Sequence, residues 1–417
     1  PAVMDALRCG ADNDAERVLR DIVDDSIAAH LRSDVPVCCL LSGGLDSSII
    51  AARSSPRVPA LRTYCAGAKP ASRDIGGDDA PDAAASPDFA MASLVARALG
   101  SDHTEAVVTR AHFAQRWPEM VRHYALPLST PNEVAINAVA RAVRARGDVV
   151  ALSGEGADEL FAGYDAALMQ AAAFEAGLDT RLRAGGVPGA GDATRGAYLD
   201  AATEFLVQWG AWITPEAKSA VLSPDLLRAG EGDAFLRAEW RDTFADALDE
   251  AWAAKRAGAG RHDDAYGEID RLRPYLGVQR RVNLAGLLLR LDQATMLESV
   301  EGRTPLADAV VARAALALPM RRAFAPAEGH TPARTKIALR RAFVPDLPRE
   351  VVERPKASFP LPFQQWVADQ VPAFRASPAA RELFTGAAIA AVCEQPQRAW
   401  QFAWPMMNLA LWADAVF

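Results

Sequence analysis

The sequence predicts an α/β protein with a parallel-sheet core and a large helical C-terminal part. Three observations support this fold class. Four short apolar runs suit buried strands, and they lie at 35–41, 60–68, 103–108 and 148–153. Segments of helical periodicity separate these runs, which is the order expected of right-handed βαβ crossovers and parallel strands. After about residue 165 the pattern is helical, broken by glycine-rich stretches at 184–191 and 257–260.

Each element follows from its local sequence. Residues 12–32 place apolar side chains at helical spacing, which predicts an amphipathic helix. The run VPVCCLL at 35–41 is too short for a helix and suits a strand that is buried on both faces. Further helices are expected at 89–100, 111–124 and 131–146. We therefore predict three parts: an N-terminal helical segment packed on the core, an α/β core, and a helical region that completes the site, at 1–33, 34–165 and 166–417.

Composition narrows the class of function. The 417 residues have a formal net charge of −8, which argues against a nucleic-acid partner. There is no run of about 18 uncharged apolar residues, so no membrane span is expected. The five cysteines form no CxxC pair and the six histidines show no zinc-ligand spacing. We therefore expect a cytoplasmic protein with reduced thiols. The oligomeric state stays open, with a homodimer as one option.

The first glycine-rich segment, LSGGLDSS at 41–48, joins a predicted strand to a predicted helix. Glycines allow a tight turn, and the amides at a helix N-terminus favour phosphate oxygens. Asp46 lies inside this loop, where a like charge about 5 Å from a phosphate would cost roughly 3 kcal/mol. Bound Mg²⁺ would reverse the sign, since it is held by carboxylates together with phosphate oxygens. The alternative is that Asp46 only caps the helix.

The second glycine-rich segment, ALSGEGADELFAGY at 151–164, follows the fourth predicted strand. Ligands of such sheets bind beyond the carboxyl ends of the strands, so we expect the two segments to meet at one edge. The segment contains three acids, Glu155, Asp158 and Glu159. A solvated turn is the alternative explanation for acids beside glycines.

Residues 42–47 match the SGGxDS loop of the ATP pyrophosphatase superfamily. Further segments resemble the synthetase domain of asparagine synthetase: DVPVCCLLSGGLDSS (34–48), LSGEGADELFAGY (152–164), LDQATMLESVEGRTPLAD (291–308), KIALRRAF (336–343) and ERPKASFPLPFQQW (353–366). These segments follow the order of the family from about residue 15 onward. The resemblance implies an ATP pyrophosphatase-like (HUP) nucleotide-binding core, in a chain without the family's N-terminal glutaminase domain.

The resemblance implies an AMP-forming amide synthetase that uses ATP and Mg²⁺. Such enzymes adenylate a carboxylate, here aspartate or an aspartate-like acid, and an amine then displaces AMP. The residues implied in binding ATP or pyrophosphate are Leu41, Ser42, Gly43, Gly44, Asp46, Ser47, Ala66, Ser153 and Gly154. Asp46 and Asp158 are implied as the Mg²⁺ ligands, which agrees with the preference of this ion for carboxylates beside phosphates.

Three residues are implied in catalysis. Glu155 matches the glutamate beside the acyl-adenylate, where a carboxylate attracts an ammonium or acts as general base. Lys356 matches the lysine of the RxKxxF motif, where a cation neutralises the α-phosphate and the leaving pyrophosphate. Glu301 lies in the family's ExR segment with Arg303, and a structural salt bridge is an equal alternative there. A surface acid and a surface lysine are the alternatives for Glu155 and Lys356.

Two further cations and three departures from the family pattern bear on the substrate. Lys336 and Arg340 are either phosphate-side cations or part of an exposed helix face. Gln293 stands where relatives have Arg or Lys, and YALPLSTP (124–131) lacks an acid that many relatives have before the proline. The acidic loop at 71–89 is a candidate lid beside the acyl site. Three explanations of the missing glutaminase domain stay open: the domain was removed from a longer chain, the glutaminase or a carrier is separate, or the nitrogen comes from free ammonia or another amine.

Three alternatives remain at this stage. The chain could be a specialised natural-product synthetase of the β-lactam synthetase or lasso-cyclase type, although Glu155 argues against the β-lactam branch, where tyrosine is usual. It could be a catalytically weak partner of a separate amidotransferase. An RNA-modifying enzyme with the same loop is disfavoured by the acidic charge and the missing CxxC.

Overall fold

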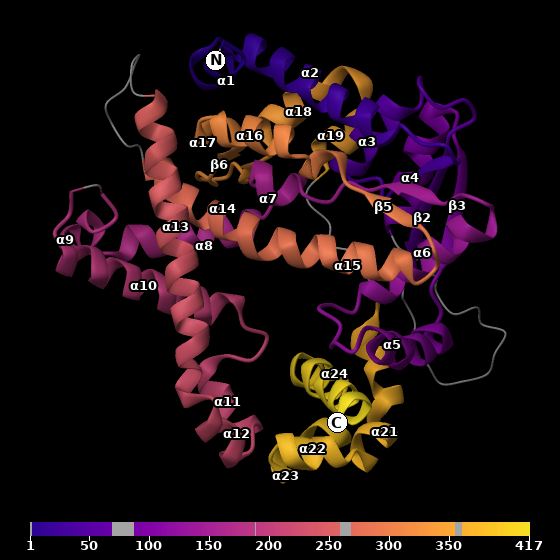
Figure 1. The fold of residues 1–417 in the computed structure, drawn as a ribbon, viewed down its shortest axis with the longest axis vertical. Helices are drawn as coiled ribbons and strands as arrows, with labels where there is room; N and C mark the ends of the chain where they lie inside the picture. The colour runs from indigo at the N-terminus through magenta and orange to yellow at the C-terminus, as the bar shows by residue number, and fades with distance from the viewer. Residues whose placement is uncertain (1, 69–86, 188, 259–267, 355–360) are drawn as a thin grey trace.

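The computed structural model describes residues 2–68, 87–187, 189–258, 268–354 and 361–417. These residues form a five-stranded parallel sheet of order β3-β2-β1-β4-β5 (Figure 1). The strands are β1 Val37–Leu40, β2 Arg62–Gly67, β3 Asp102–Val107, β4 Val150–Leu152 and β5 Glu301–Arg303. The predicted α/β class is confirmed, as are the four predicted strands.

Strand β5 was not predicted. It pairs with β4 in parallel, with Val150 opposite Glu301 and Leu152 opposite Arg303. Three residues of sequence EGR show neither an apolar run nor an alternation, so the sequence has no local strand signal there. The helical region therefore supplies an edge strand to the sheet of the core.

Helices cover both faces of the sheet. They are α1 Ala2–Cys9, α2 Asp12–His30, α3 Leu45–Ser54, α4 Pro87–Leu99, α5 Arg110–Tyr124, α6 Glu133–Ala145 and α7 Ala157–Phe161. The four helices predicted at 12–32, 89–100, 111–124 and 131–146 are confirmed as α2, α4, α5 and α6. In β1, the side chains of Cys38 and Cys39 are fully buried and join opposite apolar clusters, so this strand is buried on both faces as expected.

The helical part begins after α7. Its helices are α8 Asp165–Gly177, α9 Thr180–Ala184, α10 Asp192–Gly210, α11 Pro215–Val221, α12 Pro224–Ala229, α13 Ala234–Gly258, α14 Arg273–Val278, α15 Leu284–Met296, α16 Ala309–Ala317, α17 Met320–Ala323, α18 Ile337–Phe343, α19 Arg349–Glu353, α20 Phe363–Trp366, α21 Val371–Ala376, α22 Pro378–Leu383, α23 Gly386–Glu394 and α24 Trp400–Val416. A short antiparallel pair, β6 Phe324–Ala325 and β7 Arg334–Thr335, precedes α18. None of the helices in the described ranges combines the length and the apolar character needed to cross a membrane.

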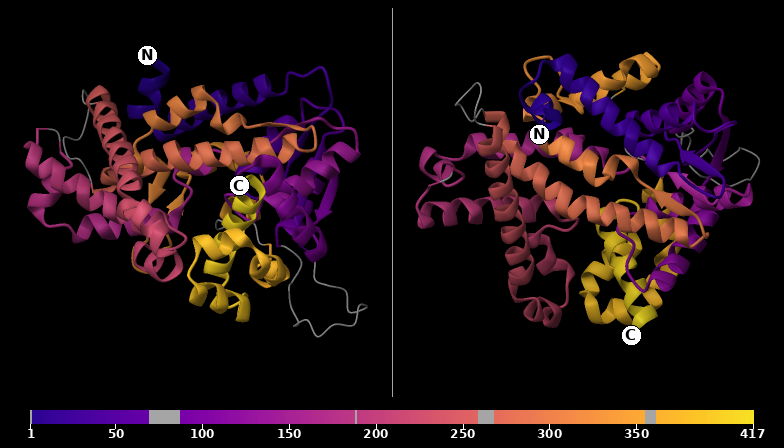
Figure 2. Two further views of the ribbon diagram at one scale, coloured as in Figure 1. Left: turned by 60° about the horizontal axis from the view of Figure 1, so that its bottom comes forward. Right: turned by 45° about the horizontal axis from the view of Figure 1, so that its top comes forward.

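Short helical turns complete the chain. They are η1 Glu231–Asp233, η2 Glu268–Leu272, η3 Gln279–Asn283, η4 Pro305–Ala307, η5 Val344–Asp346 and η6 Val367–Gln370. Helices α8 to α13 lie on the side of the molecule opposite β2 and β3, and α15 runs between the two sides (Figures 1 and 2). The C-terminal helix α24 packs on α5, where Trp404 stacks on Trp117 with ring centroids 4.3 Å apart.

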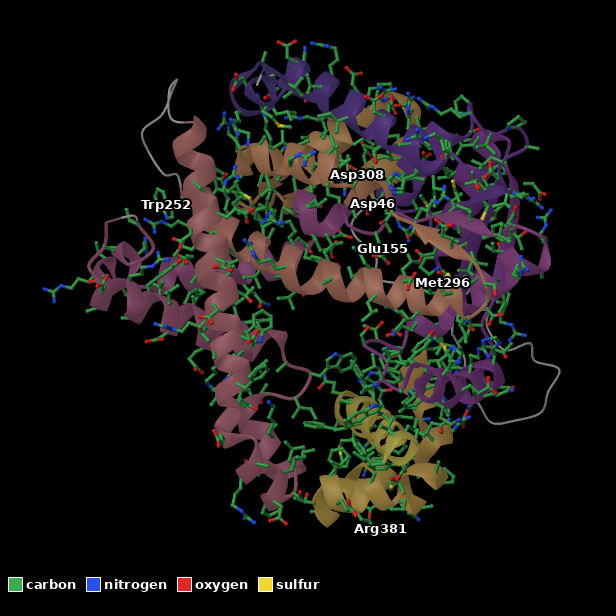
Figure 3. The ribbon with its side chains drawn as sticks, viewed as in Figure 1. Asp46, Glu155, Trp252, Met296, Asp308 and Arg381 are labelled. Carbon is green, nitrogen blue, oxygen red and sulfur yellow. The ribbon has the colours of Figure 1, made fainter. Side chains whose placement is uncertain are left out.

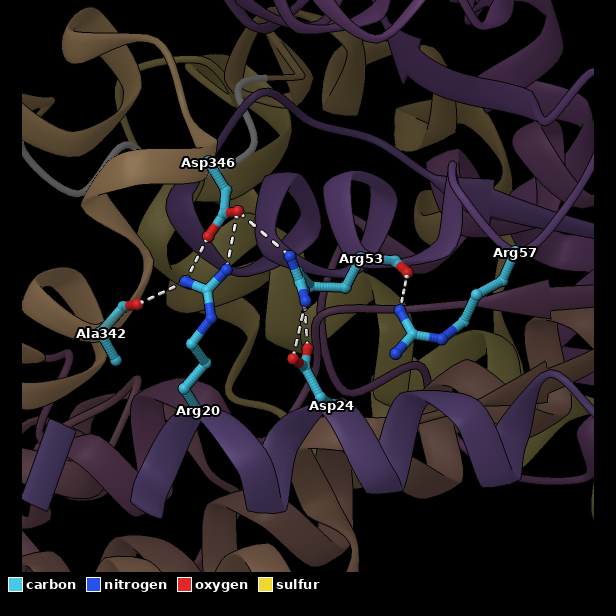
Figure 4. Close-up of polar contacts among 6 residues, drawn as sticks. All are labelled: Arg20, Asp24, Arg53, Arg57, Ala342 and Asp346. Atoms are coloured by element: carbon cyan, nitrogen blue, oxygen red, sulfur yellow. Dashed lines mark hydrogen bonds and ion pairs between the residues drawn. The ribbon is translucent and has the colours of Figure 1, made fainter. Parts of the chain in front are cut away.

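Helices α2 and α3 are tied to the end of α18 by a network of two arginines and two aspartates (Figure 4). Arg20 Nη1 and Nη2 donate to both carboxylate oxygens of Asp346, at 2.5 and 2.8 Å. Arg53 donates to both oxygens of Asp24, at 2.6 and 2.7 Å, and to Asp346 at 3.1 Å. The first turn of α3 contains Asp46, so this network anchors a helix that begins at the glycine-rich loop after β1.

Replacing Asp346 with alanine is expected to lower the free energy of unfolding by about 2 kcal/mol, because both arginines lose a charged partner in a largely buried place. Urea denaturation measures this change. In a double-mutant cycle with Arg20→Met, the two losses should not add.

The matched control is Asp225→Ala, whose carboxylate is 89% exposed and pairs with Arg228 on the surface. We expect its effect to stay within about 0.5 kcal/mol. Equal effects of the two alanine variants would contradict the role given to the network.

Candidate active site

The two glycine-rich loops meet at the carboxyl edge of the sheet. One leaves β1 and the other leaves β4, and these strands are neighbours. A Cβ on Gly154 would lie 2.9 Å from the backbone nitrogen of Ser47 and 3.0 Å from the Cβ of Asp46. Only glycine allows the loops to approach so closely. Figure 3 shows Asp46 and Glu155, one from each loop, close together beside α15.

A cavity of about 220 Å³ lies where the loops meet. Its lining includes eight of the nine residues predicted to bind ATP or pyrophosphate: Leu41, Ser42, Gly44, Asp46, Ser47, Ala66, Ser153 and Gly154. Gly43, the ninth, has a positive φ of 71°, and a Cβ there would lie 2.5 Å from Ala92 N of α4. Gly43 is therefore needed for the turn and for close packing on α4. The rest of the wall comes mainly from β2 and from the apolar face of α6.

Hydroxyl groups organise the loop after β1. Ser47 Oγ accepts a hydrogen bond from the backbone nitrogen of Ser42 at 3.2 Å and donates one to the carbonyl of Gly44 at 3.2 Å. The two serine hydroxyls lie 3.1 Å apart. Gly44 is the N-cap of α3 and has no side chain to bond the first amides of the helix. These amides and hydroxyls form a set of donors suited to an anion.

Lys336 lies buried between two of the predicted site residues. Its Nζ is 2.5 Å from Asp46 Oδ2 and 2.7 Å from Asp158 Oδ1, and its side chain is only 7% exposed. Burial lowers the pKa of Lys336, but the charges of the two aspartates outweigh it, so its pKa stays above the ordinary value. Of the two sequence-based alternatives for this lysine, the exposed helix face is wrong.

The arrangement fits the predicted Mg²⁺ ligands. Asp46 and Asp158 come from different strand ends, yet their carboxylates converge on one cation, the ammonium of Lys336. Hard oxygen donors that converge in this way suit Mg²⁺. In the described ranges no three acidic, histidine or cysteine side chains gather around one point, so an ion here would need phosphate or water as its other ligands.

Glu155 forms an ion pair that sequence analysis missed. Its Oε1 accepts a hydrogen bond from Arg290 Nη2 at 2.9 Å, and Arg290 Nη1 also donates to Thr130 at 3.2 Å. Arg290 lies on α15 and lines the cavity. One signal was available, because Arg290 is a single charge within the apolar run LLLRL. A charge inside such a run is rarely buried without a partner.

The remaining candidates lie elsewhere. Glu301 is on β5 with its side chain 57% exposed, and it accepts from Arg303 at 2.8 Å. It is not part of the cavity wall. Arg303 also donates to the carbonyls of His30 and Arg32, which favours a structural role for this pair. Lys356 and most of the acidic loop at 71–89 lie outside the described residues, and the last residues of that loop belong to α4.

Arg340 binds backbone carbonyl groups and does not line the cavity. It donates to the carbonyls of Thr335, Val352 and Arg354. Arg354 in turn donates to Asp88 at 2.8 Å and to the carbonyl of Gly43 at 3.4 Å. These bonds link the chain at Arg354, which begins the RxKxxF motif, to the glycine-rich loop after β1.

The buried carboxylate of Glu133 fixes the conformation of the turn at 129–131, the STP turn. Glu133 Oε1 accepts hydrogen bonds from Ser129 N at 2.5 Å, Ser129 Oγ at 2.7 Å and Thr130 N at 3.2 Å. Burial raises the pKa of Glu133 above its ordinary value of 4.5, although these hydrogen bonds act in the opposite direction. The turn places Thr130 against Arg290. Glu133 thus fixes the turn that contacts the cavity-lining Arg290.

This shift predicts a pH-dependent loss of stability. The folded state keeps the proton of Glu133 to higher pH than the unfolded state, so its contribution is complete below pH 4.5 and is lost as the pH rises through the folded pKa. Glu133→Gln keeps the accepting oxygen and removes this loss. The variant should therefore gain stability relative to the wild type as the pH rises above 4.5, as measured by urea denaturation at a series of pH values. The exposed Glu382→Gln is the control, and a difference that does not vary with pH would refute the prediction.

Comparison with known proteins agrees with this geometry. The family model for asparagine synthase matches residues 18–414. Asparagine synthetase [glutamine-hydrolyzing] 1 of Bacillus subtilis is 27% identical over 365 residues, which are 85% of this chain and 50% of that protein. Asparagine synthetase B [glutamine-hydrolyzing] of Escherichia coli is 35% identical over 167 residues, covering 35% of this chain and 26% of that protein.

A third relative has a different name. Amidase chyE of Penicillium rubens is 32% identical over 156 residues, covering 34% of this chain and 21% of that protein. The chain spans about half the length of the Bacillus subtilis relative that it matches along most of its own length. Because the family model covers nearly the whole chain and its glycine-rich loops converge on one cavity, this chain belongs to the asparagine synthase family.

Proposed function

We propose that this protein is an ATP-dependent, AMP-forming amide synthetase that activates aspartate or an aspartate-like carboxylate and transfers it to ammonia or an amine. The main support is the cavity lined by the serine-bearing loop, Asp46, Asp158 and Glu155, with Lys336 paired to both aspartates. Membership of the asparagine synthase family supports the reaction class.

The first step would occur at the phosphate loop. The first amides of α3 and the hydroxyls of Ser42 and Ser47 would bind the phosphates. Asp46 and Asp158 would hold Mg²⁺, which offsets phosphate charge. An oxygen of the substrate carboxylate bonds to the α-phosphorus while the bond to the bridging oxygen breaks, which releases pyrophosphate. Lys356 retains the role that the family resemblance implies for it, neutralisation of the α-phosphate.

The second step would occur at Glu155. The lone pair of the amine forms the C–N bond, the acyl C–O bond to AMP breaks, and the nitrogen loses a proton. Glu155 lines the same cavity and would accept this proton as general base. The nitrogen source in this proposal is free ammonia, ammonia released by a glutaminase, a carrier, or another amine.

A pyrophosphate-exchange screen tests the proposal. Purified protein with ATP and Mg²⁺ should exchange labelled pyrophosphate when the right carboxylate is present, and it should form AMP when ammonia is added. Asp46→Asn should lower this activity by at least about 100-fold, because the Mg²⁺ that offsets the phosphate charge would lose a carboxylate ligand. ADP as the sole nucleotide product would contradict an AMP-forming synthetase. Equal activity of wild type and Asp46→Asn would instead favour a catalytically weak partner of an amidotransferase.

The natural-product alternative rests on one feature beside the cavity. Thr130 lies in the STP turn, which departs from the family pattern, and it contacts the cavity-lining Arg290. An acyl pocket built differently suits a different acyl group or amine. Mass spectrometry of the amide formed from candidate amines separates the two functions.

We also propose a cytoplasmic location. Reduced cysteines are typical of cytoplasmic proteins, and the structure gives free thiols at four cysteines of the described residues: Cys38, Cys39, Cys65 and Cys393.

A further inference from the structure

Arg290 has bonding capacity that its protein partners do not use. Its side chain is 12% exposed and lines the cavity. Nη1 donates to Thr130 and Nη2 to Glu155, but Nε is buried and has no hydrogen-bond partner among the described residues. A buried N–H without a partner is unfavourable, so an occupant that accepts a hydrogen bond from it is favoured.

The contact with Glu155 is also incomplete. Arginine binds carboxylates best through two parallel N–H groups, and the Nε and Nη2 groups form one such edge. Glu155 occupies only Nη2, through one oxygen at 2.9 Å. A carboxylate that spans Nε and Nη2 would satisfy both donors and would compete with Glu155 for Nη2.

Arg290 is also well placed to select a substrate. It is the one basic side chain among the cavity-lining residues that the structure describes, and it lies beside Glu155. The phosphate-binding donors belong to the loop after β1, whereas Arg290 comes from α15. An acid that reacts at the phosphate end can therefore present a second anionic group to Arg290.

We propose that Arg290 determines substrate specificity: its Nε–Nη2 edge binds a second, non-reacting carboxylate of the acyl substrate, and this contact releases Glu155 toward the incoming amine. This inference rests on the proposed function, because it concerns the acid that is activated. It adds a coupling, since Glu155 stays bound to Arg290 until an acid with the second carboxylate enters.

A binding measurement under conditions in which no reaction takes place tests the inference. Calorimetry would use the protein with Mg²⁺ and an ATP analogue that cannot be cleaved between the α- and β-phosphates. The probes are L-aspartate and L-glutamate, each compared with its α-amide. The wild type should bind at least one dicarboxylate at least about tenfold more tightly than its α-amide, as expected for a charge-assisted hydrogen-bond pair. Equal affinity for every pair would overturn the inference.

Three variants sharpen the result. Arg290→Met should reduce the preference for the dicarboxylate to within about threefold, and Arg290→Lys should restore part of it, because the charge returns without the fork. Glu155→Gln should bind the dicarboxylate more tightly than the wild type, because a competitor for Nη2 is weakened. Weaker binding by Glu155→Gln would refute the competition. Thermal unfolding shows whether each variant folds.

The control is Arg195→Met, which removes an arginine paired with Asp249 on the surface of the helical part. Its binding preference should equal that of the wild type. The two proposals fail in different ways: absence of carboxylate-dependent pyrophosphate exchange would refute the proposed function, whereas exchange that is equally supported by dicarboxylates and their α-amides would refute only the role of Arg290.

Discussion

Replacing Lys336 with methionine should reduce pyrophosphate exchange by at least about 100-fold and lower the free energy of unfolding by about 3 kcal/mol. The lysine neutralises Asp46 and Asp158, which are 17% and 21% exposed and would otherwise repel each other. Its loss removes the positive charge that these two carboxylates share. Initial rates of exchange and urea denaturation measure the two effects.

A second substitution separates stability from activity. The pair Asp46→Asn with Lys336→Met removes one charge of each sign, so it should recover part of the lost stability while exchange remains low. The control is Lys218→Met, because Lys218 forms a half-buried ion pair with Asp233 at 2.7 Å and neither residue lines the cavity. Exchange by Lys336→Met at a rate close to that of the wild type would show that the lysine only stabilises the fold.

Replacing Gly163 with alanine should lower exchange by at least about tenfold and raise the Mg²⁺ concentration needed for half-maximal rate. An added Cβ would lie 1.7 Å from Asp158 Oδ1 and 2.5 Å from Lys336 Cε. Neither distance can be accommodated, so Asp158 and Lys336 must move. Exchange rates over a range of Mg²⁺ concentrations give both quantities.

Gly177→Ala is the matched control for this variant. Gly177 ends α8 and has no atom within 4 Å of an added Cβ. Alanine there should leave exchange unchanged, and its helix propensity should hold or raise stability by up to about 1 kcal/mol. If Gly163→Ala had the Mg²⁺ requirement of the wild type, Asp158 would not be a metal ligand.

Local sequence was enough to predict those parts of the candidate site that are made of consecutive residues. The strand run at 35–41, the glycines that follow it and the segment at 151–164 predicted two loops at one sheet edge, and the loops do meet there. This inference worked because parallel strands bring their carboxyl ends to the same edge whatever the helices between them do. The family resemblance rested on these segments and on three more, at 291–308, 336–343 and 353–366, and the family model that matches residues 18–414 confirms it.

Only the tertiary structure decided which charges meet. Lys336 and Asp46 are 290 residues apart, and Arg290 and Glu155 are 135 apart, so neither pair has a local signature. The strand at Glu301–Arg303 exists because β4 offers an edge, since three polar residues have no strand preference of their own. Sequence by itself determined the two loops, four of the five strands and the family of this protein, because these follow from short-range pattern. The partners of its buried charges were set by packing, because a charge that loses water must find an opposite charge wherever the fold places one.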